Sequence, residues 1–366
     1  MTSNGRADNG GAATITDVAA QAGVSIKTVS RVMNHEPGVR SDTREHVLGV
    51  MAALNYRPKL SARSLAGARS FIIGLLYFDP SAAFVAGVQQ GATLRCRDAG
   101  YHLVVESLDN DAPDLEQQVD RMVSALRPDG MILTPPLCDN PQVLKALRDS
   151  RTPCVLVSPA RDIDGMPSVR MDDAHAAEEI TELLIGLGHQ RIGFIRGATD
   201  QAASKLRYQG FLRAMKSHRI AVDKDCVVQG DFTYATGVQA AQQLLSRRMR
   251  PTAVFASNDD MALGVLATAQ RLGLAVPGDL SIAGFDDSPA AGLVWPPLTT
   301  VHQPKDEMAR AAVDLLIAAG RAEPGAPTAH RVLAHALVVR ESTNIAAARP
   351  KPRGARTPVK TRSKPV

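Results

Sequence analysis

From Phe71 onward, the sequence alternates short, wholly apolar runs with amphipathic helical stretches, and this alternation restricts the possible folds more than any other feature. Strands that are apolar throughout and separated by helices indicate parallel sheets covered by helices on both faces. After a helical stretch at 176–188 the alternation starts again, which predicts an α/β body of two doubly wound parallel-sheet subdomains with a cleft between them. The apolar runs are 71–78, 101–108, 130–135 and 153–159, then 191–197, 226–232, 252–258 and 281–287.

Polar residues close several of these apolar runs. Ser158, Asn258 and Asp286 each follow a predicted strand, and Arg207 lies in the helical stretch after the run at 191–197. In open parallel sheets, ligands bind beyond the carboxyl ends of the strands. We therefore expect a small-molecule site in the cleft.

Three pairs of adjacent acids raise the alternative of an enzyme. Neighbours on an extended segment point to opposite sides, so a consecutive pair does not converge on one substrate atom. The sequence also has no nucleophile elbow, no phosphate-binding loop and no metal-ligand spacing, so we expect no catalytic residues, no cofactor and no metal site. The pairs are Asp172-Asp173, Asp259-Asp260 and Asp286-Asp287.

Residues 14–58 have a different, purely helical pattern. Apolar residues recur at helical spacing in three consecutive stretches, and a turn containing Gly23 joins the first two, which predicts an all-α helix-turn-helix bundle. Thr16 and Ser25 are expected to cap the first two helices. The second helix presents Ile26 beside Lys27 and Arg31, a combination that is unusual for a solvent-exposed face and typical of a helix that enters a DNA major groove.

Charge is distributed unevenly along the chain. Residues 14–70 carry eight Lys and Arg against four acids, whereas residues 71–348 carry 26 basic and 32 acidic residues. A basic head on an acidic body is typical of a nucleic-acid-binding module attached to another domain. The tail from Arg349 adds seven basic residues and no acid, and it is expected to be disordered.

Other features indicate a cytoplasmic protein. We find no signal peptide and no long apolar run, so neither export nor membrane association is expected. The cysteines at 96, 138, 154 and 226 form no close pair and are expected to be reduced.

Ordered motifs from about Thr14 to about Asn344 resemble the LacI/GalR family of bacterial transcriptional repressors. The head matches through TITDVAAQAGVSIKTVSRVMN, TREHVLGVMAALNYRP and SARSLAG, and the body through GLGHQRIGFIRG, ASNDDMALGVL, VPGDLSIAGFDD and PPLTTVHQP. The resemblance implies a homodimer that binds a palindromic double-stranded DNA operator. It also implies a body of the periplasmic-binding-protein type with a small effector, most simply a sugar, in the cleft.

The resemblance also implies which residues contact DNA. In the recognition helix, Arg31 belongs to the common family motif, whereas Ile26 and Lys27 vary between members and set operator preference. In the hinge, Leu65 would be a wedge between base pairs; the alternative is that it only covers the helical bundle. The implied DNA contacts are Thr16, Ser25, Ile26, Lys27, Thr28, Ser30, Arg31, Asn34 and Tyr56 in the head, and Lys59, Ala62, Arg63 and Leu65 in the hinge.

For the effector, the matching positions imply polar anchors and two aromatic stacking faces. Carboxylate and amide oxygens accept hydrogen bonds from sugar hydroxyls, a guanidinium donates to them, and an aromatic ring covers the apolar side of a sugar. Ser158 stands where lactose-type members carry Asp, so lactose specificity is not implied. The implied effector contacts are Phe84, Ser158, Asp172, Arg207, Phe232, Asn258 and Asp286.

The predicted organisation follows from these observations. Three alternatives remain open: a nucleobase-type corepressor instead of a sugar, a sugar-binding protein without DNA function, and a sugar-modifying enzyme. The predicted segments are a disordered N-terminus at 1–13, the helix-turn-helix domain at 14–58, a hinge helix at 59–69, the body at 70–348 and the tail at 349–366. Within the body, the N-subdomain would comprise 70–171 and 301–330, and the C-subdomain 172–300 and 331–346.

Overall fold

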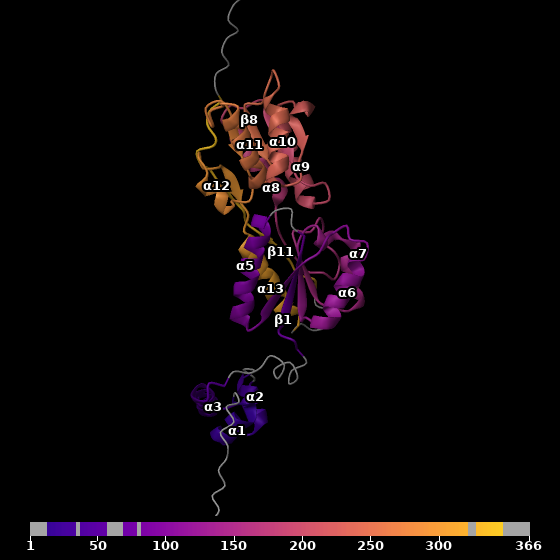
Figure 1. Ribbon diagram of the computed structural model, residues 1–366, viewed down its shortest axis with the longest axis vertical. Helices are drawn as coiled ribbons and strands as arrows, with labels where there is room; N and C mark the ends of the chain where they lie inside the picture. The colour runs from indigo at the N-terminus through magenta and orange to yellow at the C-terminus, as the bar shows by residue number, and fades with distance from the viewer. Residues whose placement is uncertain (1–12, 34–36, 57–68, 79–81, 321–326, 347–366) are drawn as a thin grey trace, which may run out of the picture.

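The computed structural model (Figure 1) describes residues 13–33, 37–56, 69–78, 82–320 and 327–346. Asn34 and the predicted hinge contacts Lys59, Ala62, Arg63 and Leu65 lie outside the described residues, as do the predicted disordered segment before residue 13 and the tail from 349. No helix in the described ranges is both long and apolar enough to cross a membrane.

The head is a bundle of three helices, as the periodicity predicts. They are α1 (Ile15–Ala22), α2 (Ile26–Met33) and α3 (Ser41–Ala53), and Gly23 ends α1 in the left-handed conformation with a φ of 64°. Val18, Val29, Val32 and Val47 are fully buried at its centre. Small as it is, the bundle therefore has a core of its own.

The N-subdomain is built on a parallel sheet with the strand order β11-β5-β4-β3-β1-β2. Helices α6 and α7 cover one face and α5 and α13 the other, so both faces of each central strand are buried. The strands are β1 (Ile72–Tyr77), β2 (His102–Ser107), β3 (Gly130–Leu133), β4 (Cys154–Val157), β5 (Ser168–Met171) and β11 (His330–Leu333). The helices are α5 (Ala82–Ala99), α6 (Leu115–Leu126), the short η1 (Leu137–Asp139), α7 (Pro141–Asp149) and α13 (Lys305–Ala319).

The C-subdomain repeats this plan with a parallel sheet of order β7-β6-β8-β9. Helices α8 and α9 pack on one face and α10 and α11 on the other. The strands are β6 (Ile192–Arg196), β7 (Val227–Gln229), β8 (Ala253–Ala256) and β9 (Ser281–Ala283). The helices are α8 (Asp173–Gly186), α9 (Ala202–Ser217), η2 (Lys224–Cys226), α10 (Tyr234–Leu245), α11 (Asp259–Arg271) and α12 (Pro289–Leu293). The predicted fold class is confirmed.

Three chain segments connect the two subdomains. They follow β5, β10 (Thr300–His302) and β11; beyond the last, β12 (Ala336–Val338) returns to pair antiparallel with β10. The boundary predicted at about residue 330 lies about three residues before the end of β11, which extends to Leu333 and pairs with β5 in the N-subdomain sheet. The run at 330–338 contains strands of both subdomains, so its hydrophobicity alone does not mark the crossing.

Candidate functional site

A cavity lies between the two subdomains, at the carboxyl ends of strands from both parallel sheets. Its empty volume is about 470 Å³, open solvent at its mouth included. Each subdomain contributes loops that follow its strands, as the rule for open parallel sheets predicts. The lining residues are Phe78, Phe84, Val85, Pro135 and Ser158 from the N-subdomain, Gln201, Ala203, Arg207, Phe232, Asn258 and Asp286 from the C-subdomain, and Gln303 from a connecting segment.

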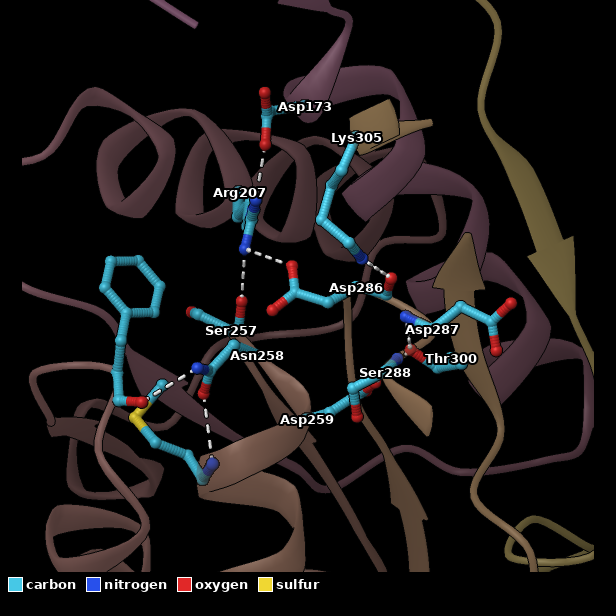
Figure 2. Close-up of polar contacts among 12 residues, drawn as sticks. Asp173, Arg207, Ser257, Asn258, Asp259, Asp286, Asp287, Ser288, Thr300 and Lys305 are labelled. Atoms are coloured by element: carbon cyan, nitrogen blue, oxygen red, sulfur yellow. Dashed lines mark hydrogen bonds and ion pairs between the residues drawn. The ribbon is translucent and has the colours of Figure 1, made fainter. Parts of the chain in front are cut away.

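Arg207 is the centre of the polar network in this cavity (Figure 2). Its Nε donates to Oδ1 of Asp173 at 2.8 Å, and one terminal nitrogen donates to the main-chain oxygen of Ser257 at 2.6 Å. The guanidinium lies over the ring of Phe285 at 3.7 Å from its centroid. Although Arg207 is only 4% exposed, its charge is therefore compensated within the protein.

Asp286 faces the same guanidinium from the loop after β9. Its Oδ1 lies 3.7 Å from a terminal nitrogen of Arg207, and its main-chain oxygen accepts a hydrogen bond from the ammonium of Lys305. Its φ of 119° is a conformation that favours glycine, so the surrounding contacts must hold this backbone in place. Together these contacts direct a buried carboxylate into the cavity.

Burial raises the pKa of Asp286 to about 6, although the charges of Arg207 and Lys305 oppose the shift. The nearby Asp260 and Asp173 add to it. Asp259, behind this loop, is fully buried, and burial together with the charge of Asp286 raises its pKa to about 7. The carboxylate of Asp259 accepts from Thr300 Oγ1 at 2.6 Å and from the amide of Ser288 at 2.7 Å.

Asn258 and Phe232 are linked by a hydrogen bond. The Asn258 amide donates to the main-chain oxygen of Phe232 at 2.8 Å, while its side-chain oxygen caps α11 by accepting from the amide of Met261 at 3.0 Å. Phe232 has a φ of 74°, and its ring packs against Gly197, where an added Cβ would collide with it. The position of this aromatic face is therefore fixed by the backbone.

Two polar side chains in the lining carry unpartnered buried atoms. Neither Oγ of Ser158 nor Oε1 of Gln303 has a hydrogen-bond partner among the described residues. A buried polar atom without a partner is unfavourable. These atoms are available to the hydroxyl groups of a ligand.

The structure brings six of the seven predicted effector contacts together around this cavity; the exception is Asp172. Asp172 is exposed, and its side chain caps α8 by accepting from the amide of His175 at 3.0 Å. Its neighbour Asp173 instead points inward to Arg207. Of this acid pair, the structure therefore links Asp173 and not Asp172 to the polar network of the cavity, because the first residue of the helix and its cap face opposite ways.

Sequence reasoning did not identify seven residues of the site. Gln303 lies in a connecting segment, Gln201 precedes α9, and Asp173 stands behind Arg207. Among these three residues, only Asp173 had a signal in the sequence, as a member of the Asp172-Asp173 pair. The other four residues are Phe78, directly after β1, Pro135, two residues after β3, Val85 on α5 and Ala203 on α9. No group of three or more His, Cys, Asp or Glu that could hold a metal ion occurs in the described ranges.

In the head, the exposed face of α2 carries the predicted base-reading side chains. Ile26 is 48% exposed, and Lys27 and Arg31 are also exposed. Ser25 caps the helix, because its Oγ accepts from the amide of Thr28 at 3.1 Å. Ser30 is partly buried beside them.

Two predictions about the head need correction. Thr14, not Thr16, caps α1: Thr14 and Asp17 form a reciprocal capping box, while Thr16 is an exposed residue within the helix. Tyr56, predicted to contact DNA, packs in the core of the bundle with an exposed fraction of 9%, and burial raises its pKa. Leu54 and Tyr56, the described apolar residues after α3, both pack against this core.

Two family models match the chain: "Bacterial regulatory proteins, lacI family" over residues 14–59 and "Periplasmic binding protein-like domain" over 181–343. Its relatives include the HTH-type transcriptional repressor PurR of Klebsiella pneumoniae (strain 342), 36% identical over 83% of this chain and 89% of the relative. The ribose operon repressor of Escherichia coli (strain K12) is also 36% identical, over 83% and 92%.

Solved structures of transcriptional regulators also resemble this chain. The lac repressor dimer bound to operator and the anti-inducer ONPF is similar with a TM-score of 0.74 and 29% identity, over 91% of this chain and 100% of that one. The complex of the transcriptional regulator CelR with cellobiose is similar with a TM-score of 0.69 and 30% identity, over 90% and 99%.

A helix-turn-helix head joined to a two-subdomain body with a ligand cavity defines the class of DNA-binding regulators that respond to a small molecule. The chain belongs to the lacI family of bacterial regulatory proteins. It is a DNA-binding transcriptional repressor of that family with an effector-binding domain, and the predicted resemblance is confirmed.

The buried acids lead to a prediction about pH. Asp259 binds its proton far more tightly in the folded chain than in the unfolded one, so the folded state gains stability as pH falls through about 7. Between pH 8 and pH 6 we expect Asp259 to add on the order of 1 kcal/mol to the free energy of unfolding. Urea denaturation of the wild type and of Asp259→Asn at both pH values measures this. The same pH slope in both proteins would contradict the assignment, and the comparison removes the opposing effect of buried His189, whose pKa is lowered.

Proposed function

We propose that this repressor binds a palindromic operator as a homodimer and is controlled by an uncharged sugar bound between its subdomains. The observation that carries the proposal is the pairing of Asp286 with Arg207 in a buried cavity that Phe84 and Phe232 also line. Asp286 and the unpartnered atoms of Ser158 and Gln303 can bond to hydroxyl groups, and the aromatic rings suit the apolar faces of a sugar.

The charges of the cavity favour a neutral ligand over a phosphorylated one. Among the described residues that line it, Arg207 is the only cation, and its charge is already shared between Asp173 and Asp286. A phosphate would have to compete with both carboxylates for the guanidinium. A nucleobase-type corepressor is the second candidate, because three phenylalanines in the lining offer stacking faces to a flat ring.

A thermal-shift experiment with the full chain tests the proposal. D-ribose, D-glucose, cellobiose, hypoxanthine and glucose 6-phosphate would each be added, and at about 100 times its dissociation constant a bound ligand stabilises the protein by about 2.7 kcal/mol. We expect a neutral sugar to give the largest shift. Asp286→Ala should remove this shift, while Asp120→Ala, an exposed aspartate on α6, should retain it. A shift with hypoxanthine alone would favour the second candidate, and a shift with only the phosphorylated sugar would refute a neutral effector.

Two exposed apolar side chains near α12 support the homodimer. Leu293 is 85% exposed and Trp295 is 75% exposed. Large apolar side chains of this kind, close together on a surface, are typical of interfaces between proteins. The lac repressor structure that resembles this chain is that of a dimer on its operator.

Replacing Trp295 with glutamate should raise the dimer dissociation constant by at least about fivefold, since an interface aromatic typically contributes more than 1 kcal/mol. Sedimentation velocity over a range of concentrations measures the change. Met249→Glu, at another exposed apolar residue, is the matched control and should have no effect. Equal dissociation constants for wild type and Trp295→Glu would place the dimer contact elsewhere.

A further inference from the structure

Lys305 is a buried lysine that links the two subdomains. It is the first residue of α13, a helix of the N-subdomain, yet its ammonium donates to the main-chain oxygen of Asp286 in the C-subdomain (Figure 2). The residue is 9% exposed. Burial of an ammonium is unfavourable unless it is hydrogen-bonded, so this contact is a strong constraint on where the two subdomains lie.

The N-subdomain holds the lysine stem from two sides. A Cβ added to Gly87 of α5 would lie 3.1 Å from Cβ and 3.2 Å from Cε of Lys305, so α5 packs directly against the stem. One turn further on, a Cβ at Gly91 would collide with the main chain of Asp306. The ammonium is therefore carried by the packed pair α5 and α13 and moves only with them.

The C-subdomain holds the backbone on either side of the Asp286 carbonyl. The amide of Asp286 donates to the main-chain oxygen of Val301 at 2.9 Å. The carboxylate of Asp287 accepts from Arg340 at 2.6 Å and lies 3.0 Å from Nδ1 of His302. The carbonyl of Asp286 is thus held by one subdomain, while its amide and the next residue are held by the other.

We propose that Lys305 is a positioning residue that couples the orientation of the two subdomains to the carboxylate of Asp286. Rotation of the N-subdomain displaces the ammonium, turns the strained peptide after Asp286 and so changes how the carboxylate faces the cavity. Conversely, a molecule that fixes this carboxylate favours one orientation of the subdomains. The second statement rests on the proposed function, because it requires the effector to contact Asp286; the first does not.

The first experiment needs no effector. Spin labels are attached to cysteines placed at the exposed Gln117 on α6 and Gln243 on α10, and the distance distribution between them is measured by pulsed electron resonance. We expect one narrow distribution in the wild-type background. Lys305→Met, which keeps a stem of similar length without the ammonium, should widen it about twofold or add a second peak. Gly87→Ala, which displaces the stem, should act in the same direction.

Two variants serve as controls. Lys305→Arg keeps a donor and a positive charge and should stay closer to the wild-type distribution than Lys305→Met. Lys145→Met, at an exposed lysine on α7, should match the wild type. Circular dichroism verifies that each variant is folded. If Lys305→Met has the wild-type distribution, the proposal is overturned, and Gly87→Ala provides the same test should Lys305→Met fail to fold.

A second experiment separates this proposal from the choice of effector. Operator affinity is measured with and without D-ribose, D-glucose or cellobiose. In the wild type, a sugar that binds should change operator affinity by roughly 5- to 150-fold, as is typical of allosteric coupling. In Lys305→Met the same sugar should change it less than about twofold while still binding. Equal coupling in both proteins would overturn the proposal. If no sugar binds the wild type but the distance distributions differ as expected, the sugar assignment fails and the subdomain link stands.

The pH dependence of sugar binding provides a further test. It would not change if Lys305 only stabilised the fold. Lys305 and Arg207 lower the pKa of Asp286, while Asp260 and Asp173 raise it, and Asp259 is coupled to it. Loss of the lysine charge should therefore move the acidic limb of the sugar-binding pH profile to higher pH. Lys305→Arg should leave this limb in place. An unchanged profile in Lys305→Met would contradict direct action on Asp286.

Discussion

Replacing Arg207 with methionine is expected to destabilise the body by about 3–5 kcal/mol and to abolish effector binding. The side chains of Arg207, Asp173 and Asp286 are each about 5% exposed, and the guanidinium lies 2.8 Å from one carboxylate and 3.7 Å from the other. Without the guanidinium, two carboxylates would remain buried without their shared cation. Urea denaturation at pH 8 measures the loss.

The size of this effect should depend on pH. Protonation removes the uncompensated charge, so the loss for Arg207→Met should be smaller at pH 5 than at pH 8. Arg213→Met, at an exposed arginine of the same helix, is the matched control and should change stability by less than about 0.5 kcal/mol. A loss below about 1 kcal/mol for Arg207→Met would mean that the network relaxes around the gap and that Arg207 is not its centre.

Much of the fold follows from the hydrophobic pattern alone. Buried parallel strands must be apolar on both faces, and this requirement makes the runs at 72–77 and 253–256 recognisable without any partner. The carboxyl ends of such strands meet at one edge of each sheet, which is why Ser158 of one sheet and Asn258 and Asp286 of the other could be predicted to line the cavity between the sheets. The strand order is not contained in this pattern, since any of these strands satisfies it at any central position.

Two of the differences between prediction and structure have the same cause. Asp172 and Asp173, or Thr14 and Thr16, are chemically equivalent near a helix start, and only the phase of the helix decides which one caps it and which one faces inward or outward. Tyr56 lies beyond the periodic stretch, so tertiary packing alone decides its burial. Gln303 belongs to a connecting segment with no strand-end signal, and its place in the cavity depends on how the two subdomains meet.

The second large effect concerns DNA. Operator affinity should fall roughly a thousandfold or more between 50 mM and 200 mM salt, as expected for a protein that neutralises about 6–10 phosphates per dimer and releases their counterions. This expectation rests on the excess of Lys and Arg over acids in residues 14–70 and on the exposed Lys27 and Arg31 of α2. Fluorescence anisotropy with a labelled palindromic duplex, selected from a random pool for binding to the full chain, measures this dependence. A flat salt dependence would refute the proposed DNA-binding face.

Lys27→Ala distinguishes base reading from phosphate binding within the same experiment. If Lys27 contacts a base, its loss should cost about 1–3 kcal/mol on the selected duplex and relax preference at one position, with the salt slope unchanged. If it contacts phosphate, affinity should fall equally on all sequences and the slope should decrease by about 1. Ile26 beside it is 48% exposed, and a thymine methyl group in the major groove would cover it. We therefore expect the first outcome, and uniform weakening on every duplex would reassign Lys27 to the DNA backbone.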